Sequence, residues 1–320
     1  MTRPAELVRV VRNGLVESIH TGDVAVCDAA GRVVAFAGDP DRTLFGRSCE
    51  KPIQGAVSIA AIQEPALTDD EVAVLCGSHN GDEVHVRAVR KLLRRGPVPV
   101  SALQNPRDRM AGGRRSRIHD NCSGKHAAML VASARNRWDL ATYRERGHPI
   151  QRRVARAVVA ATGVDRPIVG VDGCGLPVHG VPIRAMATMY ARMTQPERFG
   201  KLAPAVERVV RGMLASPILV GGSKRLDTDV MGATGDVLAK EGAEALVCAT
   251  LLGPGFGVAV KIADGSWRRT APAFVRVLRE LDVLDGSALG RLRRHASQPV
   301  LGGDRVQGEV EAVVRLQRRR

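Results

Sequence analysis

The two ends of this 320-residue chain carry the alternating apolar pattern of β-strands, while the stretch between them has the period of helices. LVRVVR and LVESIH flank Asn13-Gly14, a strong signal for a two-residue hairpin. DVAVCD and RVVAFAG form a second hairpin pattern around Ala29-Ala30-Gly31. Strand patterns return near the other end, at ALVCATLL and FGVAVKIAD. These strands bury their apolar faces most simply by meeting in one sheet.

The middle of the chain is predicted to be helical. Apolar residues recur at helical spacing from Pro52 onward, and a proline suits the first turn of a helix. Further helices are predicted near 83–95, 124–136, 149–162, 197–215 and 273–283. We therefore predict an α+β fold, with an antiparallel sheet built from both chain ends and flanked by helices. A mainly helical middle lobe is predicted roughly over 85–220, within a single catalytic domain, 1–320.

The charge composition argues against several classes of partner. The net charge is +15, and only seven of the 48 basic residues are lysine. The arginines are scattered rather than gathered on one stretch, so we predict no nucleic-acid partner. The chain has no apolar run of 18 residues, and its N-terminus lacks the apolar region of a signal peptide. We therefore predict no membrane partner and a cytoplasmic location.

Ser48 and Lys51 form a Ser-x-x-Lys motif at the start of a predicted helix. Residues three apart on a helix share one face, so the two side chains are expected to be neighbours. A lysine that is buried beside a serine loses its proton more easily and then acts as a general base. The motif alone is weak, because it arises often by chance in a chain of this composition.

Two later residues extend this pattern. Ser78 lies in CGSHNGDEVH, directly after the apolar run EVAVLC, either in a site loop or in a simple polar turn. Lys261 shares a strand face with alanines, as edge protection or as a charge kept for chemistry. The order of the three elements is that of serine β-lactamases and penicillin-binding proteins. The last element differs, since Lys261-Ile262-Ala263 is not Lys-Thr-Gly.

Two of the six cysteines stand in polar, glycine-containing segments, Cys122 in NCSGKH and Cys174 in DGCGLP. No pair has Cys-x-x-Cys spacing, and a cytoplasmic location argues against disulfides. Cys122 and His126 are four residues apart and share a helix face, so with Cys174 they are candidates for a zinc site. The alternative is that Ser-Gly-Lys forms an anion-binding helix N-terminus.

Seven blocks of the sequence together resemble the rhizobial-type, or class three, L-asparaginase family. They are RSCEKPIQ, SHNGDEVH, HDNCSGKHAAML, VDGCGLPVHGVPI, RLDTDVM, KEGAEAL and GVAVKIADG, and the match runs from about 5 to about 285. That family is related in fold to serine β-lactamases and glutaminases. The chain departs from the family pattern at Asp82, where Glu is usual, and at Ala128 and Ala245, where Gly is common.

The resemblance implies an asparaginase-type catalytic domain that hydrolyses L-asparagine to L-aspartate and ammonia. It implies two catalytic pairs, Ser48 with Lys51 and Ser78 with Lys261. Ser48 is expected to be the nucleophile. A related amide hydrolase, either a glutaminase or a β-lactamase-like enzyme, remains an alternative. So does a non-catalytic amino-acid sensor.

The resemblance also implies a Zn²⁺ ion held by Cys122, Lys125 and Cys174, in place of the His126 that spacing favoured, and a homodimer. For the substrate, we expect Asp172 to bind the α-ammonium group. Either His126 or Arg47 is expected to bind the α-carboxylate.

Overall fold

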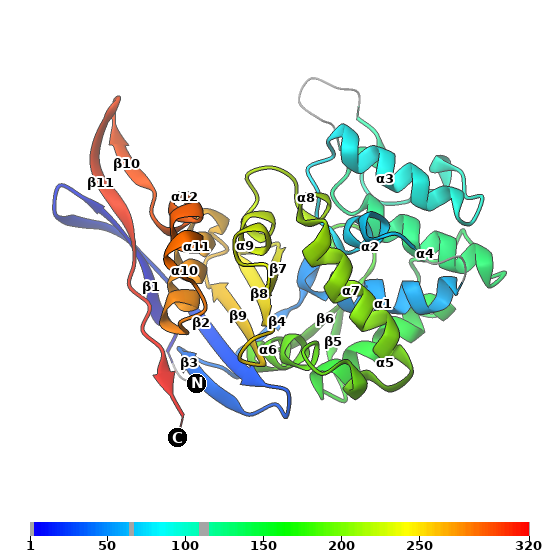
Figure 1. The fold of residues 1–320 in the computed structure, drawn as a ribbon, viewed down its shortest axis with the longest axis horizontal. Helices are drawn as coiled ribbons and strands as arrows, with labels where there is room; N and C mark the ends of the chain where they lie inside the picture. The colour runs from blue at the N-terminus through cyan, green and yellow to red at the C-terminus, as the bar shows by residue number, and fades with distance from the viewer. Residues whose placement is uncertain (1–2, 64–66, 109–114, 320) are drawn as a thin grey trace. The chain divides into compact units, whose positions relative to one another are not determined.

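The computed structural model describes residues 3–63, 67–108 and 115–319 (Figure 1). The chain divides into two compact units. Unit 1 consists of Met1–Leu44, Val181–Thr194 and Asp229–Arg320, and unit 2 of Phe45–Gly180 and Gln195–Thr228.

Unit 1 is built around one nine-stranded antiparallel sheet with the main order β10-β11-β1-β2-β9-β8-β7. β3 pairs with β2, and β12 pairs with β3. The strands are β1 (Ala5–Arg12), β2 (Leu15–Asp28), β3 (Val33–Ala37), β7 (Val237–Gly242), β8 (Leu246–Leu251), β9 (Phe256–Ile262), β10 (Pro299–Gly302), β11 (Arg305–Ala312) and β12 (Gln317–Arg318). Segments from both chain ends thus pair in one sheet, and the predicted α+β class is confirmed.

Helix α6 (Ile183–Arg192) packs on one face of this sheet, against β2, β8 and β9. Small residues on that face let the helix approach closely. A Cβ atom on Gly257 would lie 2.0 Å from the carbonyl oxygen of Ala187 and 2.3 Å from the Ala191 nitrogen. Alternation puts Val258 and Val260 on the other face, where α10 (Trp267–Glu280) packs. Two short helices, α11 (Gly286–Arg291) and α12 (Arg293–Ala296), follow α10.

Gly257→Ala is expected to lower the free energy of unfolding by about 3 kcal/mol, because the new methyl group overlaps the backbone of α6. Gly253→Ala is the matched control, since its Cβ would meet only an Asp236 carboxylate oxygen at 3.7 Å. Urea unfolding of both variants measures the difference. Equal stability of the two variants would contradict the close approach of α6.

The two N-terminal hairpins are confirmed. β1 and β2 pair across Asn13 and Gly14, which have φ values of 47° and 80°. β2 and β3 pair around the second predicted turn. The sequence interpretation did not predict β7, the hairpin of β10 and β11, or the hairpin of β5 (Ile168–Val171) and β6 (Pro177–Pro182).

Unit 2 is mainly helical. α1 packs against α2, α4, α5 and α7, and α2 packs against α3, α4, α7 and α8. The helices are α1 (Lys51–Ile62), α2 (Asp69–Cys76), α3 (Glu83–Arg94), α4 (Ser123–Arg135), α5 (Pro149–Thr162), α7 (Ala203–Ala215) and α8 (Pro217–Val220). Three of the predicted helices agree with α3, α4 and α5 within one residue. The one predicted over 197–215 is divided into the 3₁₀ segment η4 (Pro196–Leu202) and α7, and Gly200 has a non-helical φ of 52° inside η4.

The remaining short elements join these helices and the two units. β4 (Thr43–Phe45), β6 and α9 (Leu226–Thr234) each contain a point where the chain passes from one unit to the other. Three more 3₁₀ segments are η1 (Arg47–Glu50), η2 (Val100–Ala102) and η3 (Arg117–His119). Among the described residues, no helix is long and apolar enough to cross a membrane. The single catalytic domain, 1–320, stays a prediction.

Candidate active site

Ser48 lies in the 3₁₀ turn η1, which leads directly into α1 at Lys51. Arg47 opens this turn with a φ of 46°, a conformation that is uncommon for a residue with a side chain. Such a conformation persists only where the surrounding structure fixes it. The Lys51 amide donates to the Ser48 carbonyl oxygen, so the two predicted partners sit one tight turn apart.

The Lys51 side chain is fully buried, and its Nζ lies at the meeting point of three segments of unit 2. It donates to the Gly77 carbonyl oxygen at 2.5 Å, to Ser78 Oγ at 2.9 Å and to the Asn121 carbonyl oxygen at 3.2 Å. Two of these acceptors are carbonyls, which cannot donate. A neutral Lys51 would donate its two N–H bonds to these carbonyls, which would leave its lone pair to accept from a serine hydroxyl such as that of Ser78.

Ser78 follows the C-terminus of α2 and is 6% exposed. The predicted Ser48–Lys51 and Ser78–Lys261 pairs remain predictions, and the recorded hydrogen bond joins Lys51 to Ser78. The Ser78 amide donates to the Val220 carbonyl oxygen at 2.7 Å. A Cβ on the preceding Gly77 would lie 2.6 Å from that same oxygen, so the close approach requires glycine.

His79 fixes the loop after Ser78 against the start of α4. Its Nδ1 accepts from the Gly81 amide at 3.1 Å, so its Nε2 carries the proton and donates to Ser123 Oγ at 3.0 Å. Ser123 Oγ in turn donates to the Ile118 carbonyl oxygen. Burial lowers the pKa of His79 well below its ordinary value, which keeps the ring neutral, as this tautomer requires.

Cys122, Lys125 and Cys174, the three predicted metal ligands, are buried together in unit 2. Lys125 Nζ lies 3.3 Å from Cys174 Sγ, and Cys122 shares a hydrogen bond with Cys174. That hydrogen bond and the nearby lysine charges lower the pKa of Cys122 well below its ordinary value, although burial opposes them. Cys122 Sγ also lies 3.0 Å from Asn121 Oδ1, to which its thiol form donates.

The donor set fits a zinc ion. Thiolates and nitrogen bases are the ligands that zinc prefers, and two of the three side chains, Lys125 and Cys174, lie 3.3 Å apart. Within the described ranges, no three His, Cys, Asp or Glu side chains form a metal-binding group. A zinc ion at this place would need Lys125 as a third protein ligand in its deprotonated form, whereas, against the effect of burial, the neighbouring Cys174, Cys122 and Asp172 raise the pKa of Lys125 when no metal is bound.

Arg47 and Asp172, both expected to bind substrate, pair with each other. Arg47 Nε donates to Asp172 Oδ1 at 2.7 Å, and Cys174 Sγ lies 3.5 Å from Asp172 Oδ2. Burial raises the pKa of Asp172, but the Lys125 charge and the Arg47 hydrogen bond outweigh it, so the pKa falls below its ordinary value. Asp172 is thus an ionised carboxylate beside a guanidinium and the metal-ligand cluster.

His126, the third expected substrate ligand, offers a buried donor. Tyr143 Oη accepts from the Gln104 amide and donates to His126 Nδ1 at 2.6 Å. This leaves the ring proton on Nε2, which is buried and has no hydrogen-bond partner in the described part of the chain. Burial holds the pKa of His126 well below its ordinary value, so the donor is neutral.

Lys261 lies in unit 1, on β9, and is half-buried. Burial lowers its pKa from the ordinary value, against the opposing effect of Glu244, Asp264 and Asp23. A lysine with a lowered pKa is suited to proton transfer. Nine of the ten predicted site residues lie in unit 2, with Lys261 the exception.

Comparison with protein-family models gives a match over residues 8–312 to the family described as L-asparaginase II. The chain belongs to the L-asparaginase II family. The predicted family resemblance is thereby confirmed. A search of curated proteins gave no match.

Solved structures similar to this L-asparaginase II family member are distant. A crystal structure of Mglu in its glutamate form is 16% identical, with a TM-score of 0.48 over 84% of this chain and 63% of that chain. A probable glutaminase from Bacillus subtilis, complexed with 6-diazo-5-oxo-L-norleucine, is 10% identical. Its TM-score is 0.36 over 86% of this chain and 90% of that chain. This chain therefore spans less than two thirds of Mglu, and TM-scores this low support no conclusion about function.

Glu50 and His179 were not singled out from the sequence, although they lie in the blocks RSCEKPIQ and VDGCGLPVHGVPI, because no local spacing links two residues so far apart in the chain. Glu50 is 1% exposed and accepts from the His179 amide at 2.7 Å, and its other oxygen lies 2.9 Å from His179 Nδ1. A Cβ on Gly46 would lie 2.8 Å from the same carboxylate. The Glu50 side chain thus ties the turn that carries Ser48 to β6.

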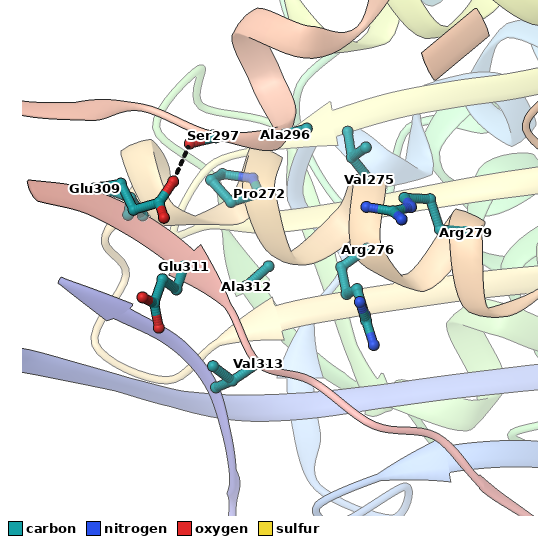
Figure 2. A pocket seen from close by; sticks show the side chains of 11 residues that line it. Pro272, Val275, Arg276, Arg279, Ala296, Ser297, Glu309, Glu311, Ala312 and Val313 are labelled. Atoms are coloured by element: carbon teal, nitrogen blue, oxygen red, sulfur yellow. Dashed lines mark hydrogen bonds between the residues drawn. The ribbon is translucent and has the colours of Figure 1, made fainter. Parts of the chain in front are cut away.

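A pocket lies in unit 1, and none of the predicted site residues is among those that line it (Figure 2). It has a volume of about 320 Å³ and is lined by α10, the end of α12 with the residue after it, and β11 with the residue after it. Its one hydroxyl nucleophile, Ser297, donates to Glu309. The lining residues are Pro272, Val275, Arg276, Arg279, Ala296, Ser297, Glu309, Val310, Glu311, Ala312 and Val313. None of these lining residues is a lysine or a histidine, so the pocket does not repeat the Ser–Lys arrangement of unit 2.

Glu50→Ala is expected to lower the free energy of unfolding by about 3 kcal/mol, because it leaves two buried His179 groups without their partner. Asp69→Ala is the control in the same unit. It removes the exposed pair with Arg211 and is expected to cost less than about 1 kcal/mol. Urea unfolding compares the two variants, and similar losses would contradict the anchoring role of Glu50.

Proposed function

We propose that this protein is an amidohydrolase that converts L-asparagine to L-aspartate and ammonia. The observation that carries the proposal is the buried Lys51 amine, held among two carbonyl oxygens and Ser78 Oγ one turn after Ser48. A buried lysine that bonds a serine hydroxyl is the arrangement that activates a nucleophile in Ser–Lys hydrolases. Membership of the L-asparaginase II family supports the choice of an amide as the substrate.

The Arg47–Asp172 pair is suited to an α-amino acid. A zwitterion entering between the two residues would offer its ammonium group to Asp172 and its carboxylate to Arg47. Asp172 and Arg47 would then lose their bond to each other and each gain an oppositely charged group of the substrate. The unpartnered Nε2–H of His126 supplies a further neutral donor for the carboxylate. Recognition of both α-groups leaves the side-chain amide as the part of the substrate that reacts.

In the proposed reaction, Ser48 Oγ attacks the amide carbon and its proton passes to neutral Lys51. The tetrahedral intermediate collapses to an acyl-enzyme, and the leaving nitrogen takes up a proton to depart as ammonia. Ser78 lies 2.9 Å from Lys51 Nζ and gives this proton a route, with Lys261 as the second base. Water then attacks the ester carbon, and Ser48 regains its proton as aspartate leaves.

Zinc is proposed as the cofactor, with Cys122, Lys125 and Cys174 as its protein ligands. A bound zinc ion would act as a Lewis acid near the substrate and would also fix the segment that carries Asp172. Asp172 is within two residues of Cys174 and in contact with its sulfur, so the metal ligands and the proposed ammonium ligand are one structural group.

Ser48→Ala and Lys51→Met are each expected to lower kcat on L-asparagine by roughly 10³-fold or more, because the nucleophile or its base is lost. Ammonia release is measured with L-asparagine and L-glutamine in parallel. Ser58→Ala is the matched control, since Ser58 is buried on the same helix and only donates to the Gln54 carbonyl oxygen. It is expected to keep its activity.

Near-normal activity of folded Ser48→Ala and Lys51→Met would contradict the proposed mechanism. A loss in Ser78→Ala but not in Ser48→Ala would instead make Ser78, the recorded partner of Lys51, the nucleophile. Faster ammonia release from L-glutamine than from L-asparagine would identify L-glutamine as the preferred substrate, and the reaction would still be amide hydrolysis.

Cys122→Ser and Cys174→Ser are expected to lose bound zinc, because an alcohol is a poor zinc ligand at neutral pH. Elemental analysis of purified protein gives the zinc content. The wild type is expected to hold zinc in equimolar amount, and so is Cys248→Ser, which changes a buried cysteine of β8 in unit 1. Zinc-free wild type after expression and dialysis with zinc would count against the metal.

A further inference from the structure

Asp23 and Lys261 stand directly opposite each other on β2 and β9. Residues opposite each other in an antiparallel pair share a face of the sheet, with Cβ atoms about 5 Å apart. This is the face on which α6 packs, since Gly257, four residues before Lys261 on the same strand, contacts α6. A carboxylate is therefore built into the strand next to Lys261.

Asp23 is fully buried, and the turn after β3 closes over it. Its Oδ1 accepts from the Asp39 amide at 2.7 Å, and a Cβ on Gly38 would lie 2.5 Å from the same oxygen. Its Oδ2 forms an ion pair with the Arg42 guanidinium. A buried carboxylate is costly without partners, and here one amide and one cation supply them.

Several charged groups face Lys261 from the elements around it. β2 contributes Asp23, the turn before β4 contributes Arg42, and the turn before β8 contributes Glu244. Asp264 follows β9 and lies 2.7 Å from His20 Nδ1 on β2, while Asp39 lies beside Asp23. Burial lowers the pKa of Lys261, the three carboxylates Glu244, Asp264 and Asp23 raise it, and Arg42 lowers it.

We infer that Asp23 and Arg42 form a positioning pair that, together with Glu244 and Asp264, adjusts the charge state of the Lys261 amine from the neighbouring strand and turn. The negative charge of Asp23 favours the ammonium form of Lys261, and the positive charge of Arg42 favours the neutral amine. The inference goes deeper into the proposed function, on which it rests, because it assigns two residues to the control of a proposed catalytic base. Neither residue needs to touch the substrate.

A purely structural role for Asp23 predicts a different result. Asp23 bonds the Asp39 amide, and Arg42 and Pro40 accept backbone hydrogen bonds from the start of α6, so loss of Asp23 would loosen this turn. Loosening changes stability in one direction for any substitution. Only an electrostatic role shifts the titration midpoint of Lys261 in one direction when the Asp23 charge is removed and in the other direction when the Arg42 charge is removed.

The test measures the titration midpoint of Lys261 in the full-length protein by NMR of ¹³C-methylated lysines. The chain has only seven lysines, and Lys261→Arg identifies the signal by its loss. Asp23→Asn is expected to move the midpoint to lower pH, and Arg42→Gln to higher pH. Asp28→Asn is the matched control: it lies on β2 opposite Phe256 and bonds Arg32, and it should leave the midpoint unchanged.

The pH profile of kcat/KM on L-asparagine is then recorded for the same variants. If Lys261 takes part in proton transfer, the limb of the pH profile that depends on Lys261 shifts in the same direction as its titration midpoint in both variants. A moving midpoint with an unmoved profile supports the positioning pair and removes Lys261 from the reaction. Unmoved midpoints in folded Asp23→Asn and Arg42→Gln overturn the inference. If Asp23→Asn does not fold, Arg42→Gln alone tests the inference. The Arg42 side chain is 38% exposed, so its replacement is expected to leave the protein folded.

Discussion

The packing of the helices in unit 2 depends on the burial of one amine, that of Lys51. Lys51 is enclosed among the start of α1, the end of α2 and the segment before α4, and its recorded acceptors come from the last two of these. A buried amine must keep hydrogen-bond partners in either charge state, so these segments cannot separate without exposing it. Because Ser78 is one of the partners of Lys51, it is held in the same place. The neighbouring Gly77 is held there too, in close contact with the backbone at Val220.

Much of this arrangement could be predicted from the sequence, because local signals decided it. The Asn13-Gly14 turn fixed the first hairpin, and α3 and α5 follow from apolar periodicity that tertiary contacts reinforce. β10 and β11 were not predicted, because they have few apolar residues and β11 pairs with β1 across nearly the whole chain length. No short-range sequence pattern indicates a pairing between strands so far apart in the chain.

The same distinction applies to the candidate site. Motif spacing brought out Ser48, Lys51, Cys122 and Cys174, because those residues stand in short polar blocks. It could not reveal that Lys51 bonds Ser78, that Glu50 clamps His179, or that Arg47 pairs with Asp172. Each of these contacts joins residues far apart in sequence. The substrate roles of Arg47, His126 and Asp172 and the zinc site remain predictions of the sequence and its family.

The chain carries nearly all its positive charge on arginine, and its few lysines are unevenly placed. Lys51, Lys125 and Lys240 are buried, while Lys91, Lys201 and Lys224 are exposed. A guanidinium keeps its proton at any physiological pH and reacts poorly with acylating or carbonyl reagents. The surface therefore offers few amines to the chemistry that acetylates or cross-links ordinary proteins through lysine. Coupling this protein to a solid support through lysine would use very few attachment points.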